Sequence, residues 1–509
     1  MCIKINPLWK TTFIGAFVMG MIAHAFALTN NLLTLDSMYS LYSTQDILSS
    51  GRQFLTYACG ISSYYNLPWL NGTLAIFWLS LCAVVIVECF KIENKYVALS
   101  IAAVLMAFPS VVSTMCYIYT IDGYMLALLI SLLAFLVTDR KKNGFWAGMV
   151  LLGISIGIYQ AYFSVVIVLC ICSLLVELIF TEKIRPILLK AARYALMGVG
   201  GYAFYVVTLK LMMAIKPDVA FSGYQGTNLV TGNPFVNIKE GLVSAYKTFF
   251  DFVLHQNILH TNSFMKVSIV VFFLCGAVAY VFLLIKKKTI FHPIRMFLTA
   301  FLVAVIPIGA TIVCVLSPNV VFHTLMRMPW VILFVFSIIL VFKAYEEFSA
   351  DISKKNQIRR ILICSELIAA FALYFCFTIN ANIVYFNLNE RYEKTYWLCS
   401  KVADLLFDEP EYRTGDVVAI LGGYPSGESL PGTEIARHEV KDYMGATGDY
   451  VVTGNTLTPF CEHYLGVTIN LLDNGEYLFF SDEFPDMPYF PSKGCVKKID
   501  GVWVVKFNG

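Results

Sequence analysis

The chain has 509 residues, of which 58% are hydrophobic and only 14% are charged, and its mean hydropathy is +0.70. Soluble domains carry roughly 25% charged residues, so the composition excludes an ordinary soluble protein and predicts a polytopic membrane protein. The formal net charge of +3 is small and its Lys and Arg residues form no clustered face, so we expect no nucleic-acid partner.

The apolar runs have the length of membrane spans. A helix that crosses the hydrocarbon needs about 20 apolar residues, or slightly fewer where aromatic residues anchor its ends. By this rule we predict eleven transmembrane helices, at residues 11–29, 71–90, 97–117, 123–138, 145–159, 161–180, 187–213, 266–285, 296–316, 321–343 and 361–380. No cleavage site follows the first of them, so we expect it to remain.

The basic loops predict how these helices are oriented. The loops rich in Lys and Arg all fall on the side of the N-terminus, and they contain Lys91 and Lys95, Arg140 to Lys142, Lys183 to Lys190, Lys286 to Arg295, and Lys354 to Arg360. The positive-inside rule then places the N-terminus in the cytoplasm. An odd number of spans sends residues 381–509 to the other face, together with the outer loops 30–70 and 214–265.

The first outer loop carries the first candidate site residues. Apolar residues at helical spacing predict an interfacial helix from Ser37 to about Ser49, with Asp36 at its start. Asp36 is either an N-cap or a catalytic carboxylate, and the two uses are compatible because a helix N-terminus stabilises an anion. Asp46, on the same helix, is expected to be solvated. Arg52 follows in the loop and is a candidate phosphate ligand.

Asp122 opens the fourth predicted span on the same face. An ionisable group at the membrane is a functional hypothesis by default, and an N-cap is the alternative. Tyr159 and Gln160 form the apex between the fifth and sixth spans, where they could hydrogen-bond a sugar or tie the two helices together.

Arg327 lies near the outer end of the tenth span, with His323 one turn before it. The guanidinium could bind an anion or snorkel to lipid headgroups. The outer loop 214–265 contains an amphipathic pattern over residues 233–254, which predicts a helix on the bilayer surface. No HExxH, GxSxG or Walker motif is present, so these classes of hydrolase and ATPase have no support.

The C-terminal residues 381–509 lose the membrane-like composition of residues 1–380. A helical pattern over 389–408 precedes four strand-like runs at 416–421, 450–454, 476–480 and 501–507, which predicts a small extracytoplasmic α/β domain. Its Cys399, Cys461 and Cys495 could form one disulfide in an oxidising compartment, although the sequence does not fix the pairing.

Four stretches point to a family, namely "TLDSMYSLYSTQDILSSGRQF", "YTIDGYMLALL", "GIYQAYFS" and "FPDMPYFPSKGCVKKIDGVWVVKF". Together they resemble the bacterial integral membrane glucosyltransferases of the GT-C class that modify O-antigens and other surface polysaccharides. The resemblance implies a GT-C-like helical fold in the cytoplasmic (inner) membrane and a polyprenyl-phosphate-glucose donor. It also implies transfer of the hexosyl unit to a polysaccharide or glycolipid acceptor at the outer face.

The resemblance also implies roles for single residues. Asp36 matches the catalytic acidic residue of the first outer loop and would act as general base in an inverting transfer, while Arg52 or Arg327 would stabilise the leaving phosphate. Asp122 and Gln160 match polar positions of the pattern. Some relatives have two adjacent acidic residues where this chain has Asp36 and Ser37. No cofactor is therefore assigned, and whether the enzyme needs a divalent cation stays open.

Two alternatives remain at this point. An O-antigen ligase or polymerase would usually have a large outer loop rich in Arg and His, whereas the 214–265 loop has two His and no Arg. A transporter of lipid-linked sugars would place charged residues or broken helices in the middle of the membrane, whereas the predicted spans are apolar at their centres.

Overall fold

The computed structural model describes residues 6–40, 43–60, 65–220, 238–254, 258–259, 261–316, 320–349, 356–424, 450–452, 456–472 and 475–507. These residues form two compact units. The first unit contains residues 6–29 and 43–382, and the second contains residues 30–40 and 383–507, with the gaps just given. Each unit is described by itself.

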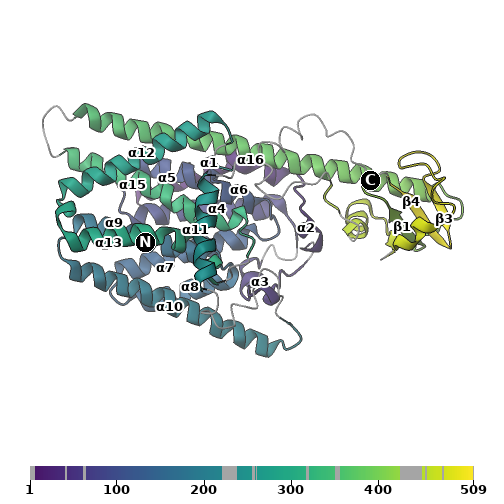
Figure 1. Cartoon of the computed structure of the whole chain (residues 1–509), viewed down its shortest axis with the longest axis horizontal. Helices are drawn as coiled ribbons and strands as arrows, with labels where there is room; N and C mark the ends of the chain where they lie inside the picture. Colours follow the sequence, from purple (N-terminus) through teal and green to yellow (C-terminus); the bar gives the residue numbers. More distant parts are fainter. Residues whose placement is uncertain are drawn as a thin grey trace, which may run out of the picture. The chain divides into compact units, whose positions relative to one another are not determined.

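The first unit is a bundle of long apolar helices (Figure 1). In the described part of the chain, nine helices are long and apolar enough to cross a membrane. They are α1 (Pro7–Thr29), α4 (Pro68–Cys89), α7 (Ile121–Arg140), α9 (Tyr162–Phe180), α10 (Ile184–Ile215), α12 (Ser263–Lys286), α13 (Pro293–Ala310), α15 (Pro329–Ser349) and α16 (Asn356–Phe407). The polytopic α-helical class predicted from the sequence is therefore confirmed.

Two of the predicted spans, those at 97–117 and 145–159, contain no single helix long enough to cross a membrane. The span expected at 97–117 is a bent pair, α5 (Lys95–Ala107) and α6 (Pro109–Met115), with 47° between the two helices, and it makes a tenth crossing if the pair counts as one. The break falls at Phe108 because Pro109 has no N–H and its ring clashes with the preceding turn. The span expected at 145–159 is α8 (Gly144–Ile158), which is apolar but has only 15 residues.

Helix α8 packs closely against its neighbours through glycines. A Cβ on Gly148 would lie 2.2 Å from Thr138 Oγ1 of α7, and a Cβ on Gly153 would lie 2.4 Å from the ring of Phe204 in α10. Small residues let helix backbones approach where no hydrophobic driving force exists between helices in lipid. This packing fixes the place of the α8–α9 apex beside the start of α7.

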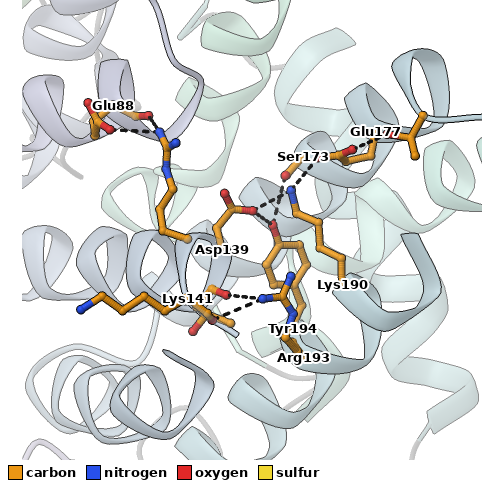
Figure 2. A network of polar contacts seen from close by, with 11 residues as sticks. Glu88, Asp139, Lys141, Ser173, Glu177, Lys190, Arg193 and Tyr194 are labelled. Carbon is orange, nitrogen blue, oxygen red and sulfur yellow. Dashed lines mark hydrogen bonds and ion pairs between the residues drawn. The ribbon is translucent and has the colours of Figure 1, made fainter. Parts of the chain in front are cut away.

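A network of charged side chains joins α4, α7, α9 and α10 where α7 and α9 end. Figure 2 shows its polar contacts. The carboxylate of Asp139 in α7 lies 2.6 Å from Lys190 Nζ and accepts a 2.6 Å hydrogen bond from the hydroxyl of Tyr194, both in α10. Lys190 also pairs with Glu177 of α9 at 3.0 Å. Because Tyr194 donates its only proton to Asp139, the 3.1 Å contact with Ser173 requires Ser173 to donate.

The neighbouring Arg140 extends this network to α4. Its Nη2 donates to the backbone carbonyl of Glu88 and to Glu88 Oε1, the latter at 3.0 Å. Arg193 Nη1 donates to the carbonyl oxygens of Thr138 and Lys141, which belong to the end of α7. The charges at this end thus satisfy one another and the terminal carbonyls of α7.

Acidic side chains are also buried in the bundle, and one of them lies near the start of the span predicted at 361–380. Glu366 of α16 is 1% exposed and accepts a 3.0 Å hydrogen bond from Ser337 of α15. The amphipathic helix predicted at 233–254 is confirmed as α11 (Ile238–Leu254), which packs on α13 and α14 (Ile312–Leu316). Its place on the bilayer surface stays a prediction.

The second unit combines the C-terminal part of α16 with a four-stranded sheet of order β2-β1-β4-β3. The strands are β1 (Val417–Leu421), β2 (Asn470–Leu471), β3 (Val496–Ile499) and β4 (Val502–Lys506). β1 pairs in parallel with β2 and β4, whereas β3 and β4 form an antiparallel hairpin. The span expected at 361–380 and the helix expected at 389–408 are one helix, α16, because no Gly or Pro interrupts it.

The strand predictions were right for β1 and β4 and wrong elsewhere. Residues 450–452 form no strand, and residues 476–480 form the 3₁₀ helix η7 (Gly475–Phe480). Strand alternation would put Leu478 and Phe480 on one face, yet Leu478 is fully buried and Phe480 is 89% exposed. A period of three fits instead, because it buries Gly475 and Leu478 together.

The core of the second unit also contains residues from the first outer loop. Leu33 and Met38 pack with Leu398 and Val402 of α16 and with Trp503 of β4. Two short helical pieces, α18 (Leu457–Phe460) and η6 (Cys461–Leu465), complete this core. The three C-terminal cysteines are buried and free, and the thiols of Cys399 and Cys461 are hydrogen-bonded to each other.

We predict that Lys190→Ala lowers the free energy of unfolding by about 3 kcal/mol, because it leaves Asp139, 11% exposed, without its ammonium partner. Thermal unfolding in detergent measures this. The control Lys142→Ala removes an exposed lysine from the neighbouring loop and should change stability by less than about 0.5 kcal/mol. Equal effects of the two substitutions would show that the network does not stabilise the bundle.

Candidate active site

Asp36 lies in the first turn of the short helix α2 (Leu35–Ser40), but it does not cap it. Thr34 Oγ1 accepts a hydrogen bond from the Ser37 N–H at 3.3 Å, and Ser37 Oγ accepts one from the Thr34 N–H at 3.2 Å. This reciprocal pair satisfies the helix N-terminus as a capping box does. The N-cap reading of Asp36 is therefore wrong. Its carboxylate is exposed, and the described residues provide no hydrogen-bond or ion-pair partner for it.

The interfacial helix predicted to run to Ser49 is also wrong. Residues 43–47 have no regular structure, and Gln45 has a φ of 56°, which an α-helix cannot contain. The outer loop instead divides, because residues 30–40 belong to the second unit and residues 43–60 to the first. Asp46 is exposed as expected, and it forms an ion pair with Lys216.

Gln160 holds the part of the loop that belongs to the first unit. Its Nε2 donates to the carbonyl oxygens of Ser50 and Gly51 at 2.8 Å and 3.0 Å. Gly51 ends the 3₁₀ turn η1 (Leu48–Ser50) with a φ of 72°, and a Cβ there would lie 2.5 Å from the Tyr205 hydroxyl. The amide of Gln160 thus ties the loop to the α8–α9 apex, and this contact fixes the residue that follows, Arg52.

Arg52 lies among tyrosines. Its Nη1 donates a 2.8 Å hydrogen bond to the Tyr124 hydroxyl, and its Cζ lies 5.3 Å from the ring centroid of Tyr159 and 5.8 Å from that of Tyr124. The two rings are stacked with centroids 4.4 Å apart. Among the described residues, this is the only hydrogen bond that the five N–H donors of Arg52 make to protein, and its Nε is buried without a partner. A guanidinium that is held by aromatic rings and has N–H groups without a protein acceptor is suited to bind an anionic ligand.

Asp122 lies two residues from Tyr124 in the first turn of α7 and is 3% exposed. The thiol of Cys59, at the end of α3 (Leu55–Ala58), lies beside the Asp122 carboxylate and donates to the carbonyl oxygen of Thr120 at 4.0 Å. Burial, together with that carboxylate, raises the pKa of the Cys59 thiol, which therefore stays protonated and donates. Gly123 permits this contact, because a Cβ there would lie 2.4 Å from Cys59 Sγ.

Arg327 ends the 3₁₀ turn η4 (Thr324–Arg327) and is 4% exposed. Its Nη1 and Nη2 donate to the carbonyl oxygens of Thr248 and Phe322 at 3.2 Å and 3.1 Å. The rings of Phe252, Phe322 and Trp330 surround its Cζ within 6 Å. Of the two readings of Arg327, snorkelling to lipid headgroups is wrong, since the side chain is buried in protein and fastens η4 to α11. His323 precedes this turn and is exposed.

The structure thus joins some predicted site residues and separates others. Arg52, Tyr159 and Gln160 form one cluster beside the start of α7, where Asp122 also lies, while Arg327 belongs to a second cluster and Asp36 to the second unit. Among the described residues, no group of three His, Cys, Asp or Glu side chains could hold a metal ion. The histidines of the 214–265 loop, His255 and His260, lie outside the described residues.

Three contributing residues were not identified from the sequence. Tyr124 and Cys59 contact Arg52 and Asp122, and Gln53 Nε2 bonds the Tyr205 carbonyl oxygen at 3.2 Å and Thr208 Oγ1 at 3.1 Å. The tyrosines flanking Asp122 in "YIYTIDGY" were a visible signal for an aromatic cluster. Cys59 and Gln53 had no such signal, because their partners are remote in the sequence.

Comparison with known families gives one match. The model described as "Glucosyl transferase GtrII" matches residues 25–334, which is more than half of the chain. The matched range contains Asp36, Arg52, Asp122 and Arg327, and it ends before α16 and the sheet. No curated protein matches the chain.

We predict that Gln160→Ala lowers the free energy of unfolding by about 1–2 kcal/mol, because two carbonyl oxygens lose their donor. Hydrogen–deuterium exchange should show the amides of residues 48–54 exchanging about tenfold faster. Asn143→Ala, at the other end of α8, is the matched control, since its side chain makes no cap hydrogen bond. Unchanged exchange in residues 48–54 would contradict the positioning role of Gln160.

Proposed function

Because the chain belongs to the GtrII family of glucosyl transferases and has the helices of a multi-pass membrane protein, we propose that it uses a polyprenyl-phosphate-glucose donor. The acceptor is a hydroxyl of a surface polysaccharide or glycolipid. Transfer takes place at the outer face of the bacterial cytoplasmic membrane, with the N-terminus in the cytoplasm and the second unit outside. A donor built inside and carried on lipid explains why the sequence has no nucleotide-binding motif.

The contacts of Arg52 support the proposal of a lipid-phosphate donor. Loss of a lipid phosphate from the anomeric carbon needs positive charge or hydrogen-bond donors at the leaving oxygen. Arg52 is fixed by Tyr124, Tyr159 and the Gln160 contact, and the described residues use only one of its N–H groups. Arg327 is a weaker candidate, because both of its Nη groups already bond backbone carbonyl oxygens.

Asp36 is proposed as the general base. Thr34 and Ser37 make the capping hydrogen bonds of α2, so the exposed carboxylate of Asp36 is not used as a cap. It can accept the proton of the acceptor hydroxyl as that oxygen attacks the anomeric carbon. Asp122 is buried beside the Cys59 thiol, so we assign it a positioning role at the start of α7. Asp36 and Arg52 belong to different units, and each role is therefore tested by itself.

The Asp36 prediction is tested in membranes supplied with synthetic polyprenyl-phosphate-glucose and the cell's own acceptor. Wild type should form glucosylated product, and Asp36→Asn should lose about 10²- to 10⁴-fold in rate at unchanged protein level. Asp46→Asn, an exposed carboxylate of the same loop, should keep the rate within about twofold. Intact donor and no product with wild type would refute the transferase proposal, whereas full activity of Asp36→Asn would refute only the base.

The Arg52 prediction uses a graded series. Arg52→Ala should lower the rate about 10²- to 10³-fold, and Arg52→Lys should recover part of it, because the ammonium keeps the charge but not the fork. Tyr124→Phe removes one hydrogen bond and should cost less, about tenfold. Arg327→Lys should mainly lower stability. Equal rates for Arg52→Ala and wild type would exclude Arg52 from phosphate departure.

A further inference from the structure

The second unit exposes an aromatic platform, which we define as Tyr477, Phe479, Phe480 and Tyr489. Their exposed fractions are 56%, 40%, 89% and 50%. Single exposed apolar residues are ordinary, but several large rings on one short segment are not, and such groups mark binding surfaces. The sheet and its core do not need these rings, because other residues of the segment fill the core.

The first part of the platform is held by buried neighbours. Leu478 is fully buried in a small core with Leu421 and Met487. In the 3₁₀ helix η7, residues three apart lie on one face, so Tyr477 and Phe480 share a face that Leu478 does not. Their positions are separated by about 6 Å along the helix axis, close to the length of one hexose unit.

The second part is held by Lys506 of β4, which is 4% exposed. Its ammonium donates to the carbonyl oxygens of Phe484 and Pro485 at 2.8 Å and 2.9 Å, and it lies 4.7 Å from the ring centroid of Tyr489. Phe479 packs edge-to-face on Phe484 with centroids 5.1 Å apart. The rings of Phe479 and Tyr489 are thus held in place before any ligand arrives, which lowers the entropy cost of binding.

Carboxylates alternate with the aromatic residues along this part of the sequence. Residues 475–494 contain four acidic residues and one lysine, and Glu476, Asp482 and Asp486 are all exposed. Glu483 pairs with Lys497 of β3 at 2.5 Å. Such a segment is repelled by anionic lipid headgroups and by phosphate groups. Carboxylates are acceptors only, so they suit a ligand rich in hydroxyl donors.

We infer that the aromatic platform binds the polysaccharide acceptor, an uncharged chain of sugars, through stacking of sugar C–H faces on the rings of Tyr477 and Phe480. The nearby carboxylates accept hydrogen bonds from its hydroxyls. This inference rests on the proposed function and deepens it, because it assigns acceptor recognition to a segment outside the matched residues 25–334. The C–H groups of a sugar carry the partial positive charge that an aromatic face attracts.

The test measures binding of surface polysaccharide, released from its lipid by mild acid, to the full-length protein in nanodiscs without donor. Phe480→Ala and Phe480→Leu should each weaken binding about tenfold, while Phe480→Trp should retain it. The comparison of Leu with Trp separates ring stacking from general apolar contact. In transfer assays the same variants should raise the acceptor KM and leave the donor KM unchanged.

Phe407→Ala is the matched control, since Phe407 is also about half exposed and belongs to α16, away from the platform segment in sequence. If Phe480→Leu binds the polysaccharide as tightly as wild type does, the inference is overturned. So would quenching of the added fluorescence of Phe480→Trp by brominated lipids, which would show bilayer contact. Transfer with an unchanged acceptor KM in Phe480→Ala would refute the platform alone, whereas polysaccharide binding without any transfer by wild type would refute the proposed function alone.

Discussion

Helix α7 carries charge only at its ends, with Asp122 in its first turn and Asp139 and Arg140 in its last. Its 20 residues span about 30 Å, which is the thickness of the hydrocarbon that cannot solvate a charge. The charged residues of α7 are therefore divided between its two ends. At one end they pair with charges of neighbouring helices, and beside the other end Arg52 is held by tyrosines.

The two ends therefore differ in how many of their polar groups are available to bind a ligand. In the network of Figure 2, Lys190, Arg140 and Arg193 each have an acidic or carbonyl partner, so these cations stabilise the bundle and have little left for a ligand. Arg52 at the opposite end is held by a phenol and two ring faces. The same bilayer constraint thus yields a structural ion-pair network on one side and a preorganised cation on the other.

Two arginines that look alike in sequence have different surroundings. Both have aromatic residues nearby in the sequence, and both were predicted as phosphate ligands. Arg327 donates to the carbonyl oxygens of Thr248 and Phe322, whereas Arg52 donates to the hydroxyl of Tyr124. No local pattern could separate them, because Thr248 and Tyr124 are each more than 70 residues away. Likewise, the capping of α2 by Thr34 and Ser37 depends on local backbone geometry. The observed helix begins at Leu35, two residues before the predicted start at Ser37.

The sequence alone determined the membrane class, the approximate positions of most apolar helices and the family, because apolar helices are read from runs of apolar residues and the family from contiguous motifs. It also located strands β1 and β4 from their β-branched residues. Only the tertiary structure decided that residues 30–40 join the second unit while residues 43–60 join the first, and that Gln160 anchors the loop before Arg52. These outcomes depend on contacts between remote residues. Hydrophobic periodicity reports which side of an element is buried, but not which partner buries it.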